Sequence, residues 1–161
     1  MLTLPQTAEY ALRAVCYVAE HEGNGPVPGP AIARALGAPR NYLSKTLHQL
    51  QSLGVLHSVR GVHGGYRLGR PANQVRLASI VEPFMPAVAH HCIMGHTRCR
   101  DDVPCGAHRR WKEVREVNRS FFANQAVSDL LEDSAAAAGR RDRESRPTPS
   151  CNLGEVLEVT S

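Results

Sequence analysis

Apolar residues recur at helical spacing through the first third of the chain. Four of them predict an amphipathic helix over about residues 6–21, which a segment of glycine, asparagine and proline at residues 23–26 ends. These four are Ala8, Leu12, Val15 and Ala19. A short second helix is expected over about residues 28–36, with Ile32 and Leu36 facing inward and Gly37 at its end.

The third expected helix, between Pro39 and Gly54, has two contrasting edges. Its apolar edge consists of Leu43, Leu47 and Leu50. Its polar and basic edge consists of Asn41, Ser44, Lys45 and His48, with Arg40 at the helix start. A short helix, a tight turn and a helix of this kind are typical of a helix-turn-helix, whose second helix enters the major groove of DNA. An ordinary solvent-exposed helix face is the alternative.

A β-hairpin is predicted next, with residues 55–59 as one strand and residues 65–68 as its return. The connecting residues 60–65 are rich in glycine and begin with an arginine. Glycines let a backbone approach a phosphate or enter a narrow minor groove, where the negative potential attracts arginine. A nucleotide-binding loop is less well supported, because no Gly-Lys-Ser/Thr follows. The candidate DNA contacts in the hairpin are Arg60, His63, Gly64, Gly65 and Arg67.

A second apolar stripe is expected along a long helix over about residues 107–123. It consists of Trp111, Val114, Val117 and Phe121. The stripe is long for a chain of this size to cover alone, so two copies are expected to pack there in a twofold homodimer. A short following helix would add Val127, Leu130 and Leu131. Packing of the stripe into the core of a monomer is the alternative.

Composition and charge narrow the function. The 161 residues, 42% apolar and 21% charged, suit one globular domain, and the absence of a signal sequence or long apolar run predicts a cytoplasmic protein without membrane contact. The net charge is +4, yet no Asp or Glu lies between Gly23 and Val81. This basic half indicates a polyanionic partner such as double-stranded DNA, and a merely solvated basic face is the alternative. No carboxylate pair or Ser–His set supports catalysis on a small-molecule substrate, so an enzyme is not expected.

Three of the five cysteines, Cys92, Cys99 and Cys105, lie close together and are followed by His108. Their spacing is wider than that of most structural zinc sites, and soft thiolates spread along a loop suit an iron–sulfur cluster. Zinc stays an alternative because further histidines surround the segment, namely His90, His91 and His96. Thiols that act as a redox switch are a third possibility. Cys16 is expected to be a small buried apolar residue.

Together these residues resemble the winged-helix bacterial regulators that include IscR, NsrR and RirA. The resemblance covers residues 1–133 and is carried by motifs in four places. They are Glu9-Tyr10-Ala11-Leu12-Arg13, Tyr42-Leu43, the hairpin with Arg60-Gly61, Gly64-Gly65-Tyr66 and Arg70-Pro71, and the cysteine trio. It implies a homodimer that binds pseudo-palindromic operators and adds Tyr42 to the candidate DNA contacts.

The resemblance also implies a ligand set. Cys92, Cys99 and Cys105 match the family's three cluster cysteines, and His108 matches the histidine that completes the cluster in IscR-like members. Glu9 is the alternative fourth ligand, because NsrR-like members supply a carboxylate from this position. Six residues separate the first two cysteines here, where the commonest pattern has five. Either a 2Fe–2S or a 4Fe–4S cluster is compatible with this set.

The sequence therefore predicts a mainly α-helical fold with a small β-hairpin, a winged helix-turn-helix joined to a long dimerisation helix. The expected parts are a DNA-binding domain, a cofactor loop, the dimerisation helix with the short helix after it, and an unstructured tail, at residues 1–80, 81–106, 107–133 and 134–161. The expected function is a repressor whose operator affinity responds to redox state, nitric oxide or iron through its cluster. A cluster-free or zinc-bound regulator and a small iron–sulfur electron carrier are the alternatives.

Overall fold

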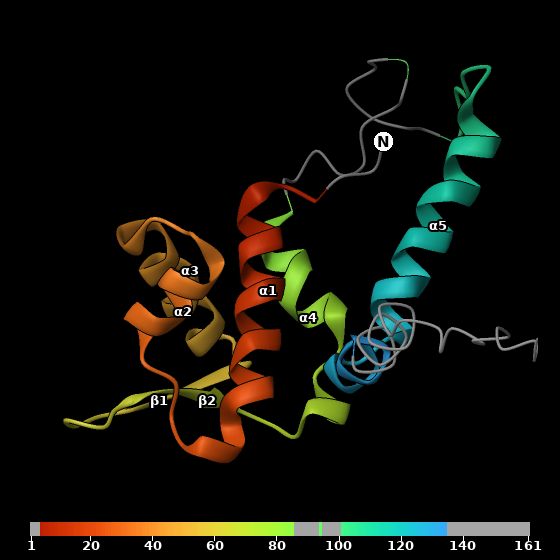
Figure 1. Ribbon diagram of the computed structural model, residues 1–161. Coiled ribbons are helices and arrows are strands. Elements are labelled where there is room, and N and C mark those ends of the chain that lie inside the picture. Colours follow the sequence, from red (N-terminus) through yellow and green to blue (C-terminus); the bar gives the residue numbers. More distant parts are fainter. Residues whose placement is uncertain (1–3, 86–93, 95–100, 135–161) are drawn as a thin grey trace, which may run out of the picture.

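The computed structural model describes residues 4–85, 94 and 101–134 of the chain (Figure 1). Most of them are helical, and two strands form an antiparallel hairpin, which confirms the predicted fold class. The helices are α1 (Gln6–His21), α2 (Gly29–Leu36), α3 (Arg40–Ser52), α4 (Leu77–Val81) and α5 (His108–Asn124). The strands are β1 (Leu56–Val59) and β2 (Gly65–Leu68), and the short 3-10 helices are η1 (Glu22–Asn24), η2 (Ala72–Gln74) and η3 (Glu82–Phe84).

Helix α1 lies at the centre of the core and contacts α2, α3 and α4. Three alanines with no exposed surface let the neighbouring helices approach its backbone closely, and Val15 and Val18 fill the remaining space. Two members of the predicted stripe, Leu12 and Ala19, are only half-buried. The buried face is thus rotated toward the alanines, which are Ala8, Ala11 and Ala14.

The turn between α2 and α3 sets the angle of the helix-turn-helix. Gly37 adopts the left-handed conformation with φ of 62°, and its N–H donates to the carbonyls of the last turn of α2. Pro39 then precedes the first residue of α3. The predicted apolar edge of α3 is confirmed as core, because Leu43, Leu47 and Leu50 are each no more than 2% exposed.

The hairpin pairs in register from Leu56 opposite Leu68 to Val59 opposite Gly65. It is tied to the body by a bridge between Val27 and Tyr66, whose backbone groups exchange two hydrogen bonds of 2.8 Å. The wing is therefore held along β2 by the segment that links α1 to α2.

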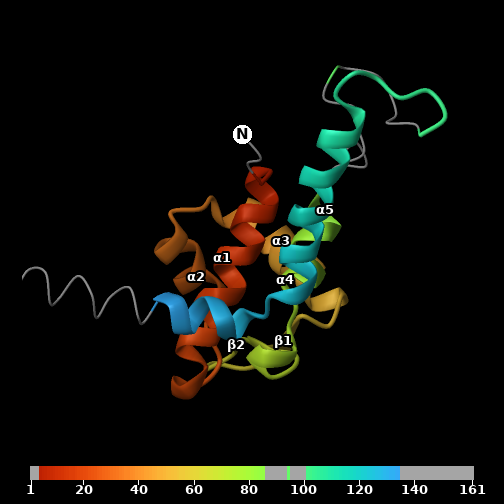
Figure 2. The same ribbon diagram turned by 90° about the vertical axis from the view of Figure 1, so that its right-hand side faces the viewer.

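Helix α5 packs against α4 at its C-terminal end and extends away from the body toward its N-terminus (Figures 1 and 2). The following segment returns to the core, where the N–H of Val127 donates to the carbonyl of Val75 at 3.0 Å. Val127 is fully buried and begins a further helix that reaches residue 134, the last described one. None of the helices in the described ranges has the length and apolar character needed to cross a membrane.

Candidate nucleic-acid interface and cofactor loop

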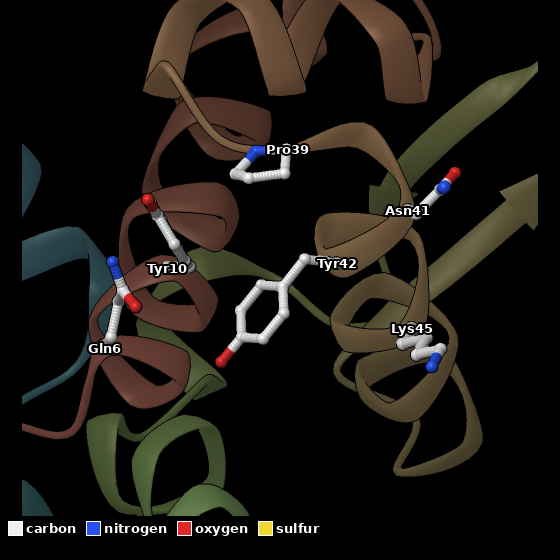
Figure 3. Close-up of a pocket in the computed structure, with 6 residues that line it drawn as sticks. All are labelled: Gln6, Tyr10, Pro39, Asn41, Tyr42 and Lys45. Atoms are coloured by element: carbon white, nitrogen blue, oxygen red, sulfur yellow. The ribbon is translucent and has the colours of Figure 1, made fainter.

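The polar edge of α3 faces solvent, as predicted. Asn41 and Lys45 point to the same side of α3, away from the core (Figure 3). The other exposed polar residues of this edge are Arg40, Ser44 and His48. Helix α3 and the hairpin lie on the side of the molecule opposite α5 (Figure 1). A duplex could therefore meet the helix and the wing together without touching α5.

The wing tip is a tight turn that presents its side chains to solvent. The N–H of Gly64 donates to the carbonyl of Gly61 at 3.0 Å, and this bond closes the turn. Arg60 and His63 are exposed beside it, and Val62 at the apex is 98% exposed. Arg67, farther down β2, is half-buried.

The structure gives a reason, not apparent from the sequence, why residues 64 and 65 are glycines. A Cβ atom at Gly64 would lie 2.4 Å from the carbonyl oxygen of Val59, and one at Gly65 would lie 2.4 Å from that of Val27. Both separations are shorter than a side chain tolerates. The two glycines therefore permit close approaches within the chain itself, and their contact with DNA stays a prediction.

Tyr42 points to the other side of α3, toward α1 (Figure 3). Its hydroxyl group forms a hydrogen bond with the Thr7 hydroxyl, and its ring meets that of Tyr10 edge to face at 5.9 Å. The side chain lines a hollow between the two helices, together with Gln6, Tyr10, Pro39, Asn41 and Lys45. Sequence patterns missed this contact because Thr7 and Tyr42 lie on different helices.

Two of the predicted metal ligands, Cys105 and His108, lie at the start of α5. The backbone N–H of His108 donates to the carbonyl of Cys105 at 2.9 Å, so one turn joins the two residues. Cys105 is half-buried and His108 is 9% exposed. The other two predicted ligands, Cys92 and Cys99, lie outside the described residues.

The imidazole of His108 is oriented by Asp101. Oδ1 of Asp101 lies 2.8 Å from Nε2 of His108 and 2.9 Å from Nζ of Lys112. The hydrogen bond from Lys112, followed by that from His108, lowers the pKa of the Asp101 carboxyl group below its usual value. Asp101 is therefore an anion at neutral pH. No sequence motif pointed to this carboxylate as a partner of His108.

An open hollow of about 630 Å³ lies beside Cys105, with mainly apolar walls. It is lined by Met94, Cys105, Gly106, Ala107, Arg110, Trp111 and Val114. A cysteine sulfur beside an apolar hollow, with a carboxylate-oriented imidazole one turn away, is the donor chemistry that an iron–sulfur cluster uses. The residues that are described thus fit the group, although no three His, Cys, Asp or Glu side chains among them gather as a metal site.

The alternative fourth ligand, Glu9, is exposed on α1. Its Oε1 lies 3.4 Å from Nη1 of Arg13, one helical turn away. Cys16, also on α1, is half-buried, and burial together with the nearby charge of Glu20 raises the pKa of its thiol to about 11. The thiol is therefore protonated at neutral pH, which agrees with the small apolar role predicted for it.

The predicted apolar stripe of α5 is largely exposed in the single chain. Val114, Val117 and Phe121 are 44%, 72% and 50% exposed, and Trp111 is half-buried. Neighbouring Phe122 instead packs against the core. The stripe is thus an apolar helix face that the described part of this chain does not cover.

A helix-turn-helix followed by a hairpin whose second strand is tied to the helical body defines a winged-helix DNA-binding protein. The model of the Rrf2 family, described as iron-dependent transcriptional regulators, matches residues 4–133, and the chain belongs to this family. It is therefore a DNA-binding transcriptional regulator and not an enzyme. The family resemblance inferred from the motifs is confirmed.

Named relatives agree with this assignment. The chain is 29% identical over 160 residues to the HTH-type transcriptional regulator IscR of Xenorhabdus nematophila, covering 98% of each chain. It is 31% identical over 128 residues to a putative HTH-type transcriptional regulator of Aquifex aeolicus, covering 78% of this chain and 88% of the relative.

Solved structures show the same fold. CymR, the global cysteine regulator of B. subtilis, superposes with a TM-score of 0.70 at 21% identity over 82% of this chain and 98% of its own. IscR of T. potens superposes with a TM-score of 0.69 at 24% identity over 84% and 90%.

Proposed function

We propose that this protein is a homodimeric repressor whose operator affinity is controlled by an iron–sulfur cluster. The observation that carries the proposal is the placement of Cys105 and His108 at the first turn of α5, in a chain of the Rrf2 family. The similarity to proteins named IscR supports the cluster. Redox state, nitric oxide and iron supply are the signals that such a cluster would report.

The proposed contacts with the duplex fall into two classes, those with phosphates and those with base edges or groove walls. Lys45, Arg60 and Arg67 would mainly neutralise phosphates, since their charges are not opposed by any acid between residues 23 and 81. The side chains proposed to reach base edges or groove walls are Arg40, Asn41, Ser44, His48 and His63. Their exposure on one side of α3 and at the wing tip supports this division.

Dimerisation would use the exposed stripe of α5. A twofold axis brings the same face of two chains together, so Val117 of one copy would meet apolar residues of the other. The pairing would hold two α3 helices about 34–36 Å apart, one turn of duplex. The start of α5, with Cys105 and His108, would then lie on the element that sets this spacing.

The cluster would be held by Cys92, Cys99, Cys105 and His108. When bound, it supplies a centre that loses or gains electrons and is sensitive to oxygen and nitric oxide. Asp101 would fix the plane of the His108 ring, and the apolar residues beside Cys105 would line one side of the cluster. Residues on this loop would thereby link the state of the cluster to the position of α5.

Anaerobic purification followed by absorbance and electron paramagnetic resonance spectroscopy tests the proposal. The wild-type protein should be coloured, contain iron and sulfide, and bind promoter DNA with an affinity that changes after exposure to air or nitric oxide. Cys105→Ala should lose the colour while retaining the fold, as judged by circular dichroism. A colourless wild-type protein whose DNA affinity does not depend on iron would contradict the cluster.

A thiol-based switch is the second candidate. The structure of S. aureus CymR in an oxidised form, with a TM-score of 0.64 over 81% of this chain, supports it at the level of the fold. Cys16 is a poor candidate for such a switch because its thiol is protonated at neutral pH. DNA binding that responds to peroxide in iron-free protein and requires Cys105 would favour this second function.

A further inference from the structure

The first turn of α3 carries much of the proposed DNA-reading surface, yet it has no side-chain cap of its own. Pro39 occupies the capping position, and its side chain offers no hydrogen-bond acceptor. Helix ends without caps fray readily, because their first N–H groups lack intrahelical partners. The orientation of Arg40 and Asn41 must therefore be fixed by contacts from outside the helix.

Tyr42 supplies such a contact. It leaves α3 in the same turn as Arg40 and Asn41, but it points toward α1 (Figure 3). There its hydroxyl group bonds to that of Thr7, and its ring packs edge to face against Tyr10. Thr7 and Tyr10 are three residues apart, so they lie on one face of α1. Two separate points of α1 thus hold a single side chain of α3.

The other end of α3 is held differently. Leu47 and Leu50 are buried in the core, and the carbonyl of Leu50 accepts a hydrogen bond from the N–H of Val55. Apolar packing of this kind resists tilting of the C-terminal half. Near the N-terminus, only Leu43 provides comparable burial. The bond between Tyr42 and Thr7 therefore acts where α3 is otherwise least constrained.

We infer that Tyr42 is a positioning residue, which fixes the first turn of α3 against α1 through Thr7. It thereby sets the orientation of Arg40 and Asn41 relative to the duplex. The inference rests on the DNA-binding role of α3. Tyr42 would then contribute to operator recognition through α1 and not by touching a base.

A double-mutant cycle of Tyr42→Phe and Thr7→Val tests this role. Each substitution removes one hydroxyl group and preserves nearly all of the side-chain volume. Hydrogen exchange is measured first, without DNA, at the amides of residues 43–46, which begin with the N–H of Leu43 that donates to the carbonyl of Pro39. Exchange should become several-fold faster than in the wild-type protein in both single variants. In the double variant, it should be no faster than in the single variants, because either change breaks the same bond. Unchanged exchange in Tyr42→Phe would overturn the inference.

Operator affinity at fixed salt is measured next. Each single variant and the double variant should bind a specific operator about five-fold more weakly, as expected for one hydrogen bond. Binding to nonspecific DNA and the salt slope should not change, because no charge is lost. Tyr10→Phe is the matched control, since its hydroxyl group points away from Tyr42 (Figure 3).

The cycle also separates this role from direct DNA contact. If Tyr42 touched the duplex, Tyr42→Phe would weaken operator binding, Thr7→Val would not, and the inference would be wrong. If the wild-type protein bound no promoter DNA, the proposed function would fail, while the exchange measurement would still decide whether Thr7 and Tyr42 position α3.

Discussion

Asp101 and His108 are joined by a hydrogen bond of 2.8 Å between Oδ1 and Nε2, across the start of α5. A carboxylate bonded to one ring nitrogen fixes the plane of an imidazole, and such outer partners stabilise metal-bound histidines. Lys112 holds the same oxygen at 2.9 Å and keeps the carboxylate in place. The loop and the first turns of α5 therefore form one connected polar unit.

We predict that Asp101→Ala makes the proposed cluster easier to remove. Loss of an outer partner lowers metal affinity by about 10- to 100-fold, so bleaching of the visible absorbance by a chelator should accelerate by a similar factor. Glu113→Ala, which removes an exposed carboxylate elsewhere on α5, is the control. Equal bleaching rates in the two variants would show that Asp101 has no part in retaining the cluster.

Arg60→Ala should weaken DNA binding on every sequence. Arg60 is exposed beside the wing tip, and a phosphate contact contributes about one unit to the slope of log K against log salt concentration. The slope should fall by about that amount in a titration from low to moderate salt. Arg119→Ala on α5, where the guanidinium group already pairs with Glu116 at 2.8 Å, should leave the slope unchanged.

Gly65→Ala should destabilise the protein by about 1–3 kcal/mol, as overpacking does in a well-packed site. The new methyl group would lie 2.4 Å from the carbonyl oxygen of Val27, so the bridge between Val27 and Tyr66 would have to open. Thermal unfolding measures the effect. Gly23→Ala is the control, because a Cβ atom there meets nothing within 4 Å. Equal stability of the two variants would contradict the close approach.

Local patterns sufficed for most elements of this fold. The extent of α1 could be predicted from its apolar spacing and the segment at residues 23–26 that ends it, and the hairpin from the glycine-rich segment between two short strands. Contacts between segments that are distant in sequence could not be predicted in this way. The bond of Thr7 to Tyr42 and the bridge of Val27 to Tyr66 depend on how whole helices pack, and neither leaves a periodic signal.

The same distinction applies to the functional surfaces. Exposure of Asn41 and Lys45 followed directly from their positions opposite the leucines of α3. Asp101 was not identified as a partner of His108, because an acidic residue in a polar loop has many possible neighbours. The ligand roles of Cys92 and Cys99 stay a prediction, since both residues lie outside the described part of the chain.

Cys16 should react slowly with alkylating reagents in the folded protein. Its thiol has a pKa of about 11 against an ordinary value of 9.0, so at pH 8 the reactive thiolate is about 100-fold scarcer. Because the folded pKa is the higher one, this residue's contribution to stability is full below pH 9 and falls as the pH rises toward 11. Mass spectrometry after iodoacetamide treatment, with and without urea, measures the difference. Fast labelling without urea would show that the thiol is not protected.

Val117→Glu should break the proposed dimer. Val117 is 72% exposed in the single chain, so the substitution leaves the monomer's core intact. In a twofold interface, it would bury two carboxylates close together at a cost of several kcal/mol, which raises the dimer dissociation constant by roughly 100-fold or more. Light scattering coupled to size-exclusion chromatography gives the mass, and circular dichroism checks the fold.

Val62→Glu is the matched control, because it introduces the same charge at the wing tip, on the side opposite α5. It should leave the mass at that of a dimer, although it weakens DNA binding by bringing a negative charge toward the phosphates. Val117→Glu should weaken operator binding for a different reason, since two half-sites are then no longer bound by one assembly. The proposed interface on α5 would be wrong if the wild-type protein were monomeric at micromolar concentration. It would also be wrong if the Val117→Glu variant stayed dimeric. In either case, the exposure of the apolar stripe would have no explanation.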